Sequence, residues 1–297
     1  MLLFLRGTVT KTIKANRIGH NFLFVFAVFF HLFSKDALAV DIKVAVFSDH
    51  YSTIQTAIKN NACPETNEVE FGENQMLAEY LLLCNALKLG GLNVNLILVD
   101  FPVIDRVIGA LSKEQVLISG FGVWQQDAFS ANLATSSELI APYKFTKGLY
   151  TTKQKAQALS DNFAPQKLIA VANQNWKNDW QALKCSGFNA LHVNQYQQMF
   201  NLVELGRADI LPLTFGAGDE LSRNQFGISL YPVKGVKIAF KDSLNFAVNA
   251  NSLLGIQLLE ALNRGLAILK AKDKIDNLYY RLGLFNETVD NWKELGC

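Results

Sequence analysis

Few residues of this chain have the types and spacing that acid–base or metal chemistry requires. Asp49 and His50 follow a short apolar run, and Glu73 stands before a helical pattern, so these three are the candidates for a general acid or base. Beyond residue 39 the other histidine, His192, lies far from His50 without metal-ligand spacing. The sequence therefore predicts no metal site.

Motifs of other chemistries are missing. No G-x-S-x-G nucleophile elbow, zinc-binding helix or phosphate-cradling loop occurs in the sequence. The pairs Gly120/Gly122 and Gly216/Gly218 are isolated and are weak signals alone. We therefore predict no cofactor, and a protein that is not an enzyme.

The first 39 of the 297 residues are typical of a secretory signal peptide. A leader containing Arg6, Lys11, Lys14 and Arg17 precedes the apolar run 22–33 and an Ala-Leu-Ala pattern that ends at Ala39. A membrane anchor is the alternative, but the run has about 12 residues and a spanning helix needs about 20. We expect cleavage after Ala39 and an exported protein. No cysteine follows directly, so a lipoprotein is not supported.

Removal of the leader changes the charge balance. Residues 1–39 hold five of the 28 Lys and Arg and one of the 26 Asp and Glu, which leaves 23 bases against 25 acids and a net charge of −2. No basic stripe remains for nucleic acid. Half of the residues are hydrophobic and 18% are charged, as in a folded globular protein.

All four cysteines lie beyond the leader, where an oxidising compartment permits disulfides. Cys63 and Cys84 are close in sequence and form the favoured pair, although four cysteines allow three connectivities and the sequence does not choose among them. Cys84 stands beside Leu81, Leu82 and Leu83, so a buried free thiol is the alternative there.

Two sets of alternating strand-like and helix-like segments divide the rest of the chain. The first set has strands at 42–47, 93–99 and 116–119, a helix at 73–89 stopped by Gly90-Gly91, and a loop from Gly120. The second has strands at 166–172, 190–193 and 209–215, with helices at 176–185 and 196–205. Helices at 252–269 and 273–282 and a surface turn at 291–295 end the chain.

Extended segments at 137–152 and 236–248 connect the two sets. Two crossings between two α/β lobes predict a hinge with a ligand cleft beneath it. The expected division is a signal peptide at 1–39, lobe one at 40–144 and 243–297, and lobe two at 145–242.

This order of elements resembles the bacterial periplasmic solute-binding proteins of the two-crossing type (type II), in particular the polar amino-acid receptors of ABC importers. The marks are the crossing 141–152 with Gly148-Leu149-Tyr150, the turn 205–209 and the tail 259–284. The resemblance covers about residues 41–295. It implies a periplasmic monomer that closes over a small-molecule solute and docks on a permease or a sensor.

The resemblance also implies that loops at strand ends hold the ligand. Gly120 and Gly122 would permit close backbone approach, and Tyr51 and Trp124 would cover an apolar face. The helix that starts at Trp176 could receive an anionic group. The full expected set is Ser48, Asp49, Tyr51, Gly120, Gly122, Trp124, Gln125, Asn173, Trp176, Thr214 and Asp219. The alternatives are core or lobe-interface packing for Trp124 and Trp176, and solvated loops for Asp49 and His50.

Two departures from the amino-acid receptors bear on the ligand. Those receptors have an Arg after the third strand for the ligand carboxylate, whereas no Arg or Lys lies between Lys113 and Lys144 here. They also have an acid after a strand of lobe two, and the nearest one following Asp209 is Asp219. We therefore expect a neutral, partly aromatic or hydroxylated ligand rather than a simple α-amino acid. A signalling or interaction protein with little ligand binding, and an exported dehydratase-like enzyme, are the alternative functions.

Overall fold

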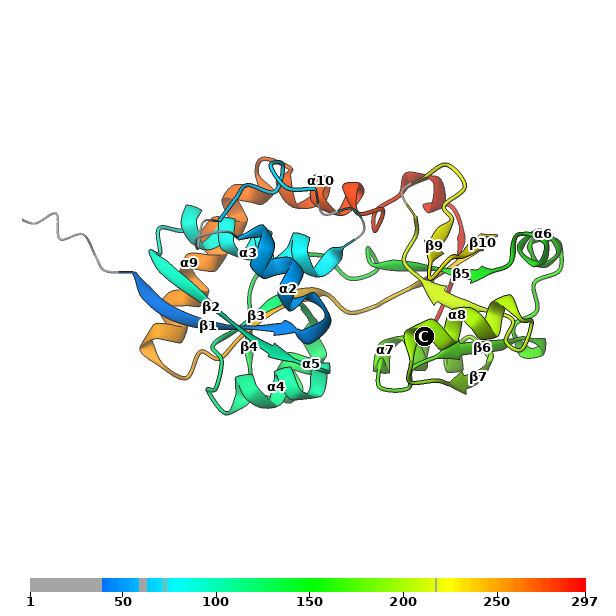
Figure 1. Ribbon diagram of the computed structural model, residues 1–297, viewed down its shortest axis with the longest axis horizontal. Coiled ribbons are helices and arrows are strands. Elements are labelled where there is room, and N and C mark those ends of the chain that lie inside the picture. Colours follow the sequence, from blue (N-terminus) through cyan, green and yellow to red (C-terminus); the bar gives the residue numbers. More distant parts are fainter. Residues whose placement is uncertain (1–38, 59–62, 71, 73, 217) are drawn as a thin grey trace, which may run out of the picture. The chain divides into compact units, whose positions relative to one another are not determined.

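The computed structural model describes residues 39–297 except 59–62, 71, 73 and 217 (Figure 1). The expected leader lies outside this part of the chain apart from Ala39, and so does Glu73. No helix among the described residues is long and apolar enough to cross a membrane.

The first sheet contains the expected N-terminal strands. Its order is β2-β1-β3-β11-β4, with β1 parallel to β2 and β3, and β11 antiparallel to β3. The strands are β1 (Val40–Phe47), β2 (Val94–Phe101), β3 (Ile118–Trp124), β4 (Ala134–Thr135) and β11 (Leu244–Val248).

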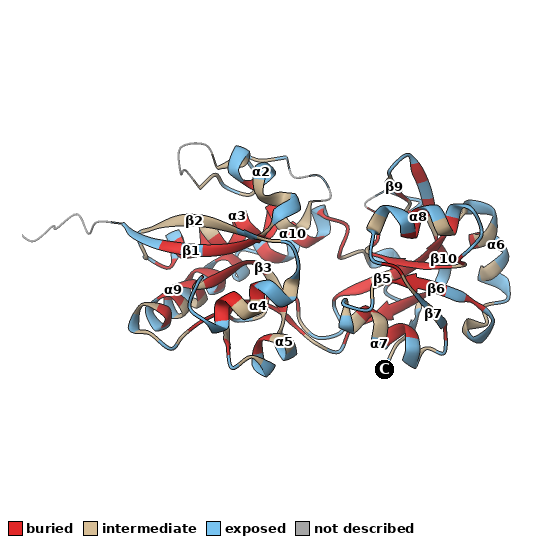
Figure 2. Ribbon diagram, turned by 60° about the horizontal axis from the view of Figure 1, so that its bottom comes forward, coloured by how far each residue is buried: buried red, intermediate tan, exposed pale blue. Residues whose placement is uncertain are grey.

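Helices cover both faces of this sheet. One buried cluster joins β1 to α3 and α9, and another joins β3 to α4 on the opposite face. Because α3 lies between the sheet and α9, it is buried almost all round (Figure 2). The helices are α2 (Ser48–Ala57), α3 (Gln75–Leu89), α4 (Ile104–Ser112), α5 (Gln125–Ser130), α9 (Leu253–Lys270) and α10 (Lys274–Arg281).

The second sheet has the order β12-β10-β5-β8, and β9 pairs with β10. Beside it, β6 and β7 form a two-stranded parallel sheet that a single bridge from Ala170 to Ile210 links to the chain before β8. The strands are β5 (Thr146–Thr151), β6 (Ile169–Ala172), β7 (Asn189–His192), β8 (Leu211–Leu213), β9 (Arg223–Gln225), β10 (Ile228–Ala239) and β12 (Lys293–Leu295). The helices are α6 (Lys153–Asp161), η2 (Pro165–Lys167), α7 (Lys177–Cys185) and α8 (Tyr196–Glu204).

Two extended segments run between the sheets, one from β4 to β5 and one from β10 to β11. They are hydrogen-bonded to each other: Tyr143 N–H donates to the Phe240 carbonyl (2.7 Å), Phe240 N–H to the Phe145 carbonyl (3.2 Å) and Leu244 N–H to the Ile140 carbonyl (3.0 Å). The prediction of a two-lobed α/β fold with paired crossings is confirmed. The lobe boundaries at 144/145 and 242/243 stay a prediction.

The C-terminal residues differ from the prediction. Residues 291–295 are not a surface turn, because β12 pairs in parallel with β10, in the register Val236↔Lys293 to Ile238↔Leu295. The end of the chain therefore belongs with the second sheet rather than with lobe one. Trp292 packs edge-on against Phe215, with ring centroids 5.6 Å apart. The strand was not predicted because three residues are too few to show an alternating pattern.

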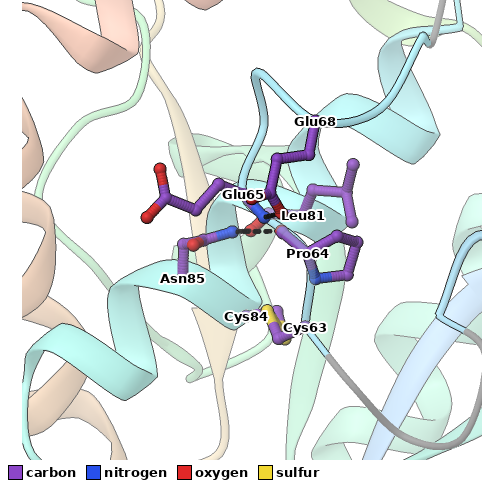
Figure 3. The surroundings of a disulfide bond; sticks show 7 residues. All are labelled: Cys63, Pro64, Glu65, Glu68, Leu81, Cys84 and Asn85. Atoms are coloured by element: carbon purple, nitrogen blue, oxygen red, sulfur yellow. Dashed lines mark hydrogen bonds between the residues drawn. A yellow bond between two sulfur atoms is a disulfide. The ribbon is translucent and has the colours of Figure 1, made fainter.

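The structure joins Cys63 to Cys84, the favoured pair, and Cys185 to Cys297. The first bond ties a loop to α3, and the Asn85 amide of this helix reinforces the tie by donating to the Pro64 carbonyl of the loop (2.8 Å; Figure 3). The second bond ties the end of the chain to the end of α7.

Candidate functional site

The residues expected after the first strand lie on a helix rather than in a loop. The helix α2 begins at Ser48, directly after β1, and contains Asp49, His50 and Tyr51. The Ser48 hydroxyl donates to Asp100 Oδ2 at the end of β2 (2.8 Å), while Asp49 is exposed and Tyr51 packs against the core. Burial lowers the pKa of His50, and the nearby Asp49 carboxylate opposes this shift.

The expected loop from Gly120 is a strand. β3 continues through Gly120 and Gly122 to Trp124, and α5 begins at Gln125. Phe121 and Val123 are buried on alternate positions, so the strand pattern continues between the glycines. A Cβ at Gly120 would lie 3.0 Å from the Ala45 carbonyl oxygen, so here glycine permits close strand packing.

A fully buried carboxylate lies behind this strand. Glu79 on α3 accepts hydrogen bonds from the Gly122 N–H (2.8 Å), the Gln75 amide (2.8 Å) and the Tyr279 hydroxyl of α10 (3.1 Å). Burial raises the pKa of Glu79, and the three hydrogen bonds oppose the rise. The group therefore fixes the strand that ends at Trp124 to two helices.

Glu79 gives the protein a stability that depends on pH. A carboxyl whose pKa is raised by folding stabilises the native state below its unfolded pKa, and this contribution is lost as the pH rises through the folded pKa. We therefore expect Glu79→Gln to lose less unfolding free energy than wild type as the pH rises above the ordinary pKa of a glutamate, 4.5. Urea titrations across this range measure the difference, and parallel profiles for the two proteins would contradict it.

The residues expected in lobe two lie at the predicted strand ends. Asn173 follows β6, and its side-chain oxygen accepts from the Asn175 N–H (2.9 Å), while Trp176 precedes α7. Thr214 follows β8, and its hydroxyl accepts a hydrogen bond from the guanidinium of the buried Arg223. Asp219 is exposed.

Two of the expected residues, Trp124 and Trp176, belong to one cluster of rings around Lys147. Trp124 lies 5.4 Å from Phe145 and 5.3 Å from Phe240, between ring centroids. The Lys147 ammonium lies 5.8 Å from the Phe240 centroid, 6.0 Å from Phe145 and 5.9 Å from Trp176. These distances are those of cation–π contacts. We call these five residues the Lys147 cluster.

An ion pair completes this arrangement. Lys147 Nζ lies 2.6 Å from Asp179 Oδ1, and the two side chains are 16% and 9% exposed. The cluster therefore combines a mostly buried salt bridge with two half-buried tryptophans, at the place where both crossings meet β5 and β10. Such a surface can bind a flat or partly aromatic molecule by stacking.

Lys147, Asp179 and Arg223 are not among the residues expected from the sequence. A signal for Lys147 exists, since a charged residue inside a strand that is otherwise expected to be buried needs a partner. No spacing rule identifies Asp179 as that partner, because it comes from a helix more than 30 residues later. Other expected residues make contacts elsewhere: Ser48 with Asp100, Asn173 with Asn175, and Thr214 with Arg223.

A separate cavity of about 390 Å³ lies between α4, α5 and the start of α7. Asp105, Asp127, Gln126 and Lys177 line it, and Lys177 Nζ is 3.6 Å from Asp105 Oδ1. Burial raises the pKa of Asp127, while Lys177 opposes this and Asp242 and Asp105 add to it. Within the described residues no group of three His, Cys, Asp or Glu could hold a metal ion.

Solved structures with a similar chain course agree on the fold. No family model and no curated protein matches the chain. An amino acid ABC transporter substrate-binding protein of Streptococcus pneumoniae bound to L-arginine is 16% identical, with 83% of this chain and 97% of that chain covered and a TM-score of 0.51. An ancestral amino acid-binding protein, a precursor of cyclohexadienyl dehydratase, is 16% identical, with 82% of this chain and 94% of that chain covered and a TM-score of 0.50.

The periplasmic VFT2 domain of Bordetella pertussis BvgS is 15% identical, with 83% of this chain and 93% of that domain covered and a TM-score of 0.50. At these identities the likeness establishes the fold alone. The chain has the fold of the two-lobed periplasmic binding proteins, and the resemblance expected from the sequence is confirmed at that level.

Proposed function

We propose that this chain is an exported solute-binding protein that closes its two lobes around a small ligand beside the Lys147 cluster. The observation that carries the proposal is that Trp124, from the end of β3, and Trp176, from the start of α7, belong to this one cluster. Closure would bring groups of both lobes onto the ligand, and the ligand would stabilise the closed state.

The ligand we propose is partly aromatic or hydroxylated and is not a simple α-amino acid. The region between Lys113 and Lys144 offers no Arg or Lys for a carboxylate. The cation of this cluster, Lys147, is already paired with Asp179, and a ligand carboxylate would have to compete for it. Stacking on Trp124 and hydrogen bonds to Ser48, Gln125, Asn173 and Thr214 suit an uncharged polar molecule.

We propose export through the predicted leader and a partner that is either an importer permease or a sensor. The two disulfides suit an oxidising compartment. The experiment that tests ligand binding is native mass spectrometry of gently purified protein, followed by a thermal-shift screen of neutral, anionic and zwitterionic solutes. Bound ligand raises the apparent stability by RT ln(1 + [L]/Kd). Retention of no molecule and no shift with any solute would favour a signalling or interaction protein, and turnover of a carboxylic solute would favour an enzyme.

Trp124 is the residue whose removal tests this site. We expect Trp124→Ala to weaken binding of the ligand found in the screen by about tenfold or more, since lost stacking costs about 0.5–1.5 kcal/mol beyond the lost apolar burial. Isothermal titration measures the change in Kd. Phe129→Ala is the matched control, because Phe129 is 78% exposed on α5 and should leave Kd unchanged.

A Trp124→Ala protein that fails to fold would show instead that Trp124 is part of the core. Circular dichroism and the unfolding midpoint decide between the two results. A variant that folds and binds as wild type does would remove Trp124 from the site.

A further inference from the structure

The C-terminal segment forms a third connection between the two sheets. After α10 the chain passes through the turn η3 (Glu287–Val289) and ends in β12, which pairs with β10. We call residues 284–297 the C-terminal strap.

The strap begins on helices that cover the first sheet. Leu284 is buried, and the Leu284 and Phe285 N–H groups donate to the Tyr279 carbonyl of α10 (3.0 and 3.2 Å). Phe285 packs against two residues of α10, Tyr279 and Tyr280, with ring centroids 5.4 and 5.6 Å apart. Tyr279 in turn donates to the buried Glu79. The start of the strap is therefore fixed to lobe one.

The other end of the strap is fixed to lobe two. Val289 is buried in the cluster around Tyr150 and Phe215. The Lys237 ammonium, on a side chain only 5% exposed, donates to the Val289 and Asp290 carbonyls (2.9 and 3.0 Å). The anchors that follow are Trp292 on Phe215, the ladder of β12 with β10, the hydrogen bond from Lys241 Nζ to the Cys297 carbonyl, and the Cys185–Cys297 disulfide.

The spacer between these anchors is short. Asn286, Glu287 and Thr288 alone separate Phe285 from Val289, and four residue steps span at most about 14 Å when fully extended. The spacer is also coiled: Asn286 Oδ1 accepts from the Thr288 N–H (3.0 Å) and hydroxyl (2.6 Å). A 3₁₀ turn rises about 2 Å per residue, so complete unwinding would add only about 5 Å.

We propose that the C-terminal strap limits the rotation of the two lobes about their two crossings, and that the Cys185–Cys297 disulfide keeps this limit in place. Two crossings alone leave a hinge free to bend. A third connection with about 5 Å of slack stops any rotation that separates α10 from β10 by more than this distance.

The disulfide matters because the rest of the final anchor is weak. β12 has three residues and lies at the edge of its sheet, and terminal segments fray unless something holds them. The bond to α7 places a covalent stop behind the strand. The inference rests on the strap's own contacts and needs no ligand.

The test measures how fast the crossings open. Two variants release the strap: Cys185→Ser/Cys297→Ser removes the covalent stop, and an insertion of Gly-Ser-Gly-Ser between Glu287 and Thr288 adds slack while keeping the disulfide. The matched control is Cys63→Ser/Cys84→Ser, which removes the disulfide of lobe one. The readout is amide hydrogen exchange of Tyr143, Phe240 and Leu244, whose hydrogen bonds join the two crossings.

We expect exchange at these three amides to become about tenfold faster in both strap variants and to stay at the native rate in the control. Faster exchange confined to β12, with native rates at the crossings, would overturn the proposal. It would mean that release of the strap loosens only its own strand and leaves the hinge unchanged. If the double serine variant does not fold, the insertion variant decides. None of these outcomes depends on whether the protein binds a solute.

Discussion

Gly265→Ala should destabilise the protein by about 4 kcal/mol or more, since overpacking of a filled site costs 1–3 kcal/mol even where neighbours can move. Gly265 lies in the middle of α9, where the helix contacts α3. A Cβ built on it would lie 1.7 Å from the Ala86 carbonyl oxygen and 2.5 Å from its carbon. These are backbone atoms, so relief requires the two helices to move apart.

The same contact leaves little room for such a movement. One turn away, a Cβ at Gly90 would lie 1.9 Å from the Ala261 carbonyl oxygen. The guanidinium of Arg264 donates twice to the Gly90 carbonyl (3.2 and 3.0 Å), which fixes the end of α3 against α9. Separation of the helices at Gly265 would therefore break contacts along the pair.

Gly109→Ala is the matched control, because Gly109 lies inside helix α4 and a Cβ there would meet nothing within 4 Å. Alanine in a helix interior stabilises by roughly 0.5–1 kcal/mol over glycine. Urea unfolding of both variants should therefore give changes of opposite sign. A Gly265→Ala protein as stable as wild type would mean that α3 and α9 do not pack backbone to backbone.

The sequence was sufficient to predict the helices and strands whose residue patterns are strong and local. The first strand is a run of β-branched and apolar residues, and the structure has β1 there with Ile42, Val44 and Val46 buried. The helix before Gly90-Gly91 is equally clear, because seventeen residues of apolar spacing end at two glycines. The crossing at 137–152 followed from Pro142 and the β-favouring residues after it, and the crossing at 236–248 followed from a second extended run.

The sequence was misleading at glycines, which occur both in loops and at closely packed positions inside strands. Gly120 and Gly122 were interpreted as a loop that leaves room for a ligand, whereas they sit inside β3, one against Ala45 and the other against Glu79. A glycine in a strand can mark a turn or the close approach of a neighbour, and only the neighbour distinguishes them. Here the neighbour is a buried carboxylate from a helix more than 40 residues earlier.

The remaining misses are long-range pairings. β12 pairs with a strand more than 50 residues earlier. Lys147 forms its ion pair with Asp179, which lies on a helix of the next βα unit. Composition and periodicity describe each segment separately. They therefore cannot show which distant strands pair, or which buried cation forms an ion pair with which carboxylate. This is why the candidate site was predicted from its tryptophans but not from its ion pair.

That ion pair should be among the most sensitive points of the protein. We expect Lys147→Met to lower the free energy of unfolding by about 3–5 kcal/mol, because it leaves Asp179 buried without its cation. The same substitution removes the charge that lies over Phe145, Phe240 and Trp176. Urea unfolding measures the loss.

The double variant Lys147→Met/Asp179→Leu separates the two causes. If the loss comes from an uncompensated carboxylate, replacing both partners by apolar groups should recover most of it, since buried ion pairs are often no more stabilising than apolar packing of similar volume. If the loss comes instead from cation–π contacts, which contribute about 0.5–2 kcal/mol, the double variant should stay as unstable as the single one. Lys153→Met is the control, because the Lys153–Glu220 pair is more than half exposed and its loss should leave the free energy of unfolding nearly unchanged. A recovered double variant that also keeps its affinity for the solute would show that the charge serves the fold, and that the rings alone form the binding surface.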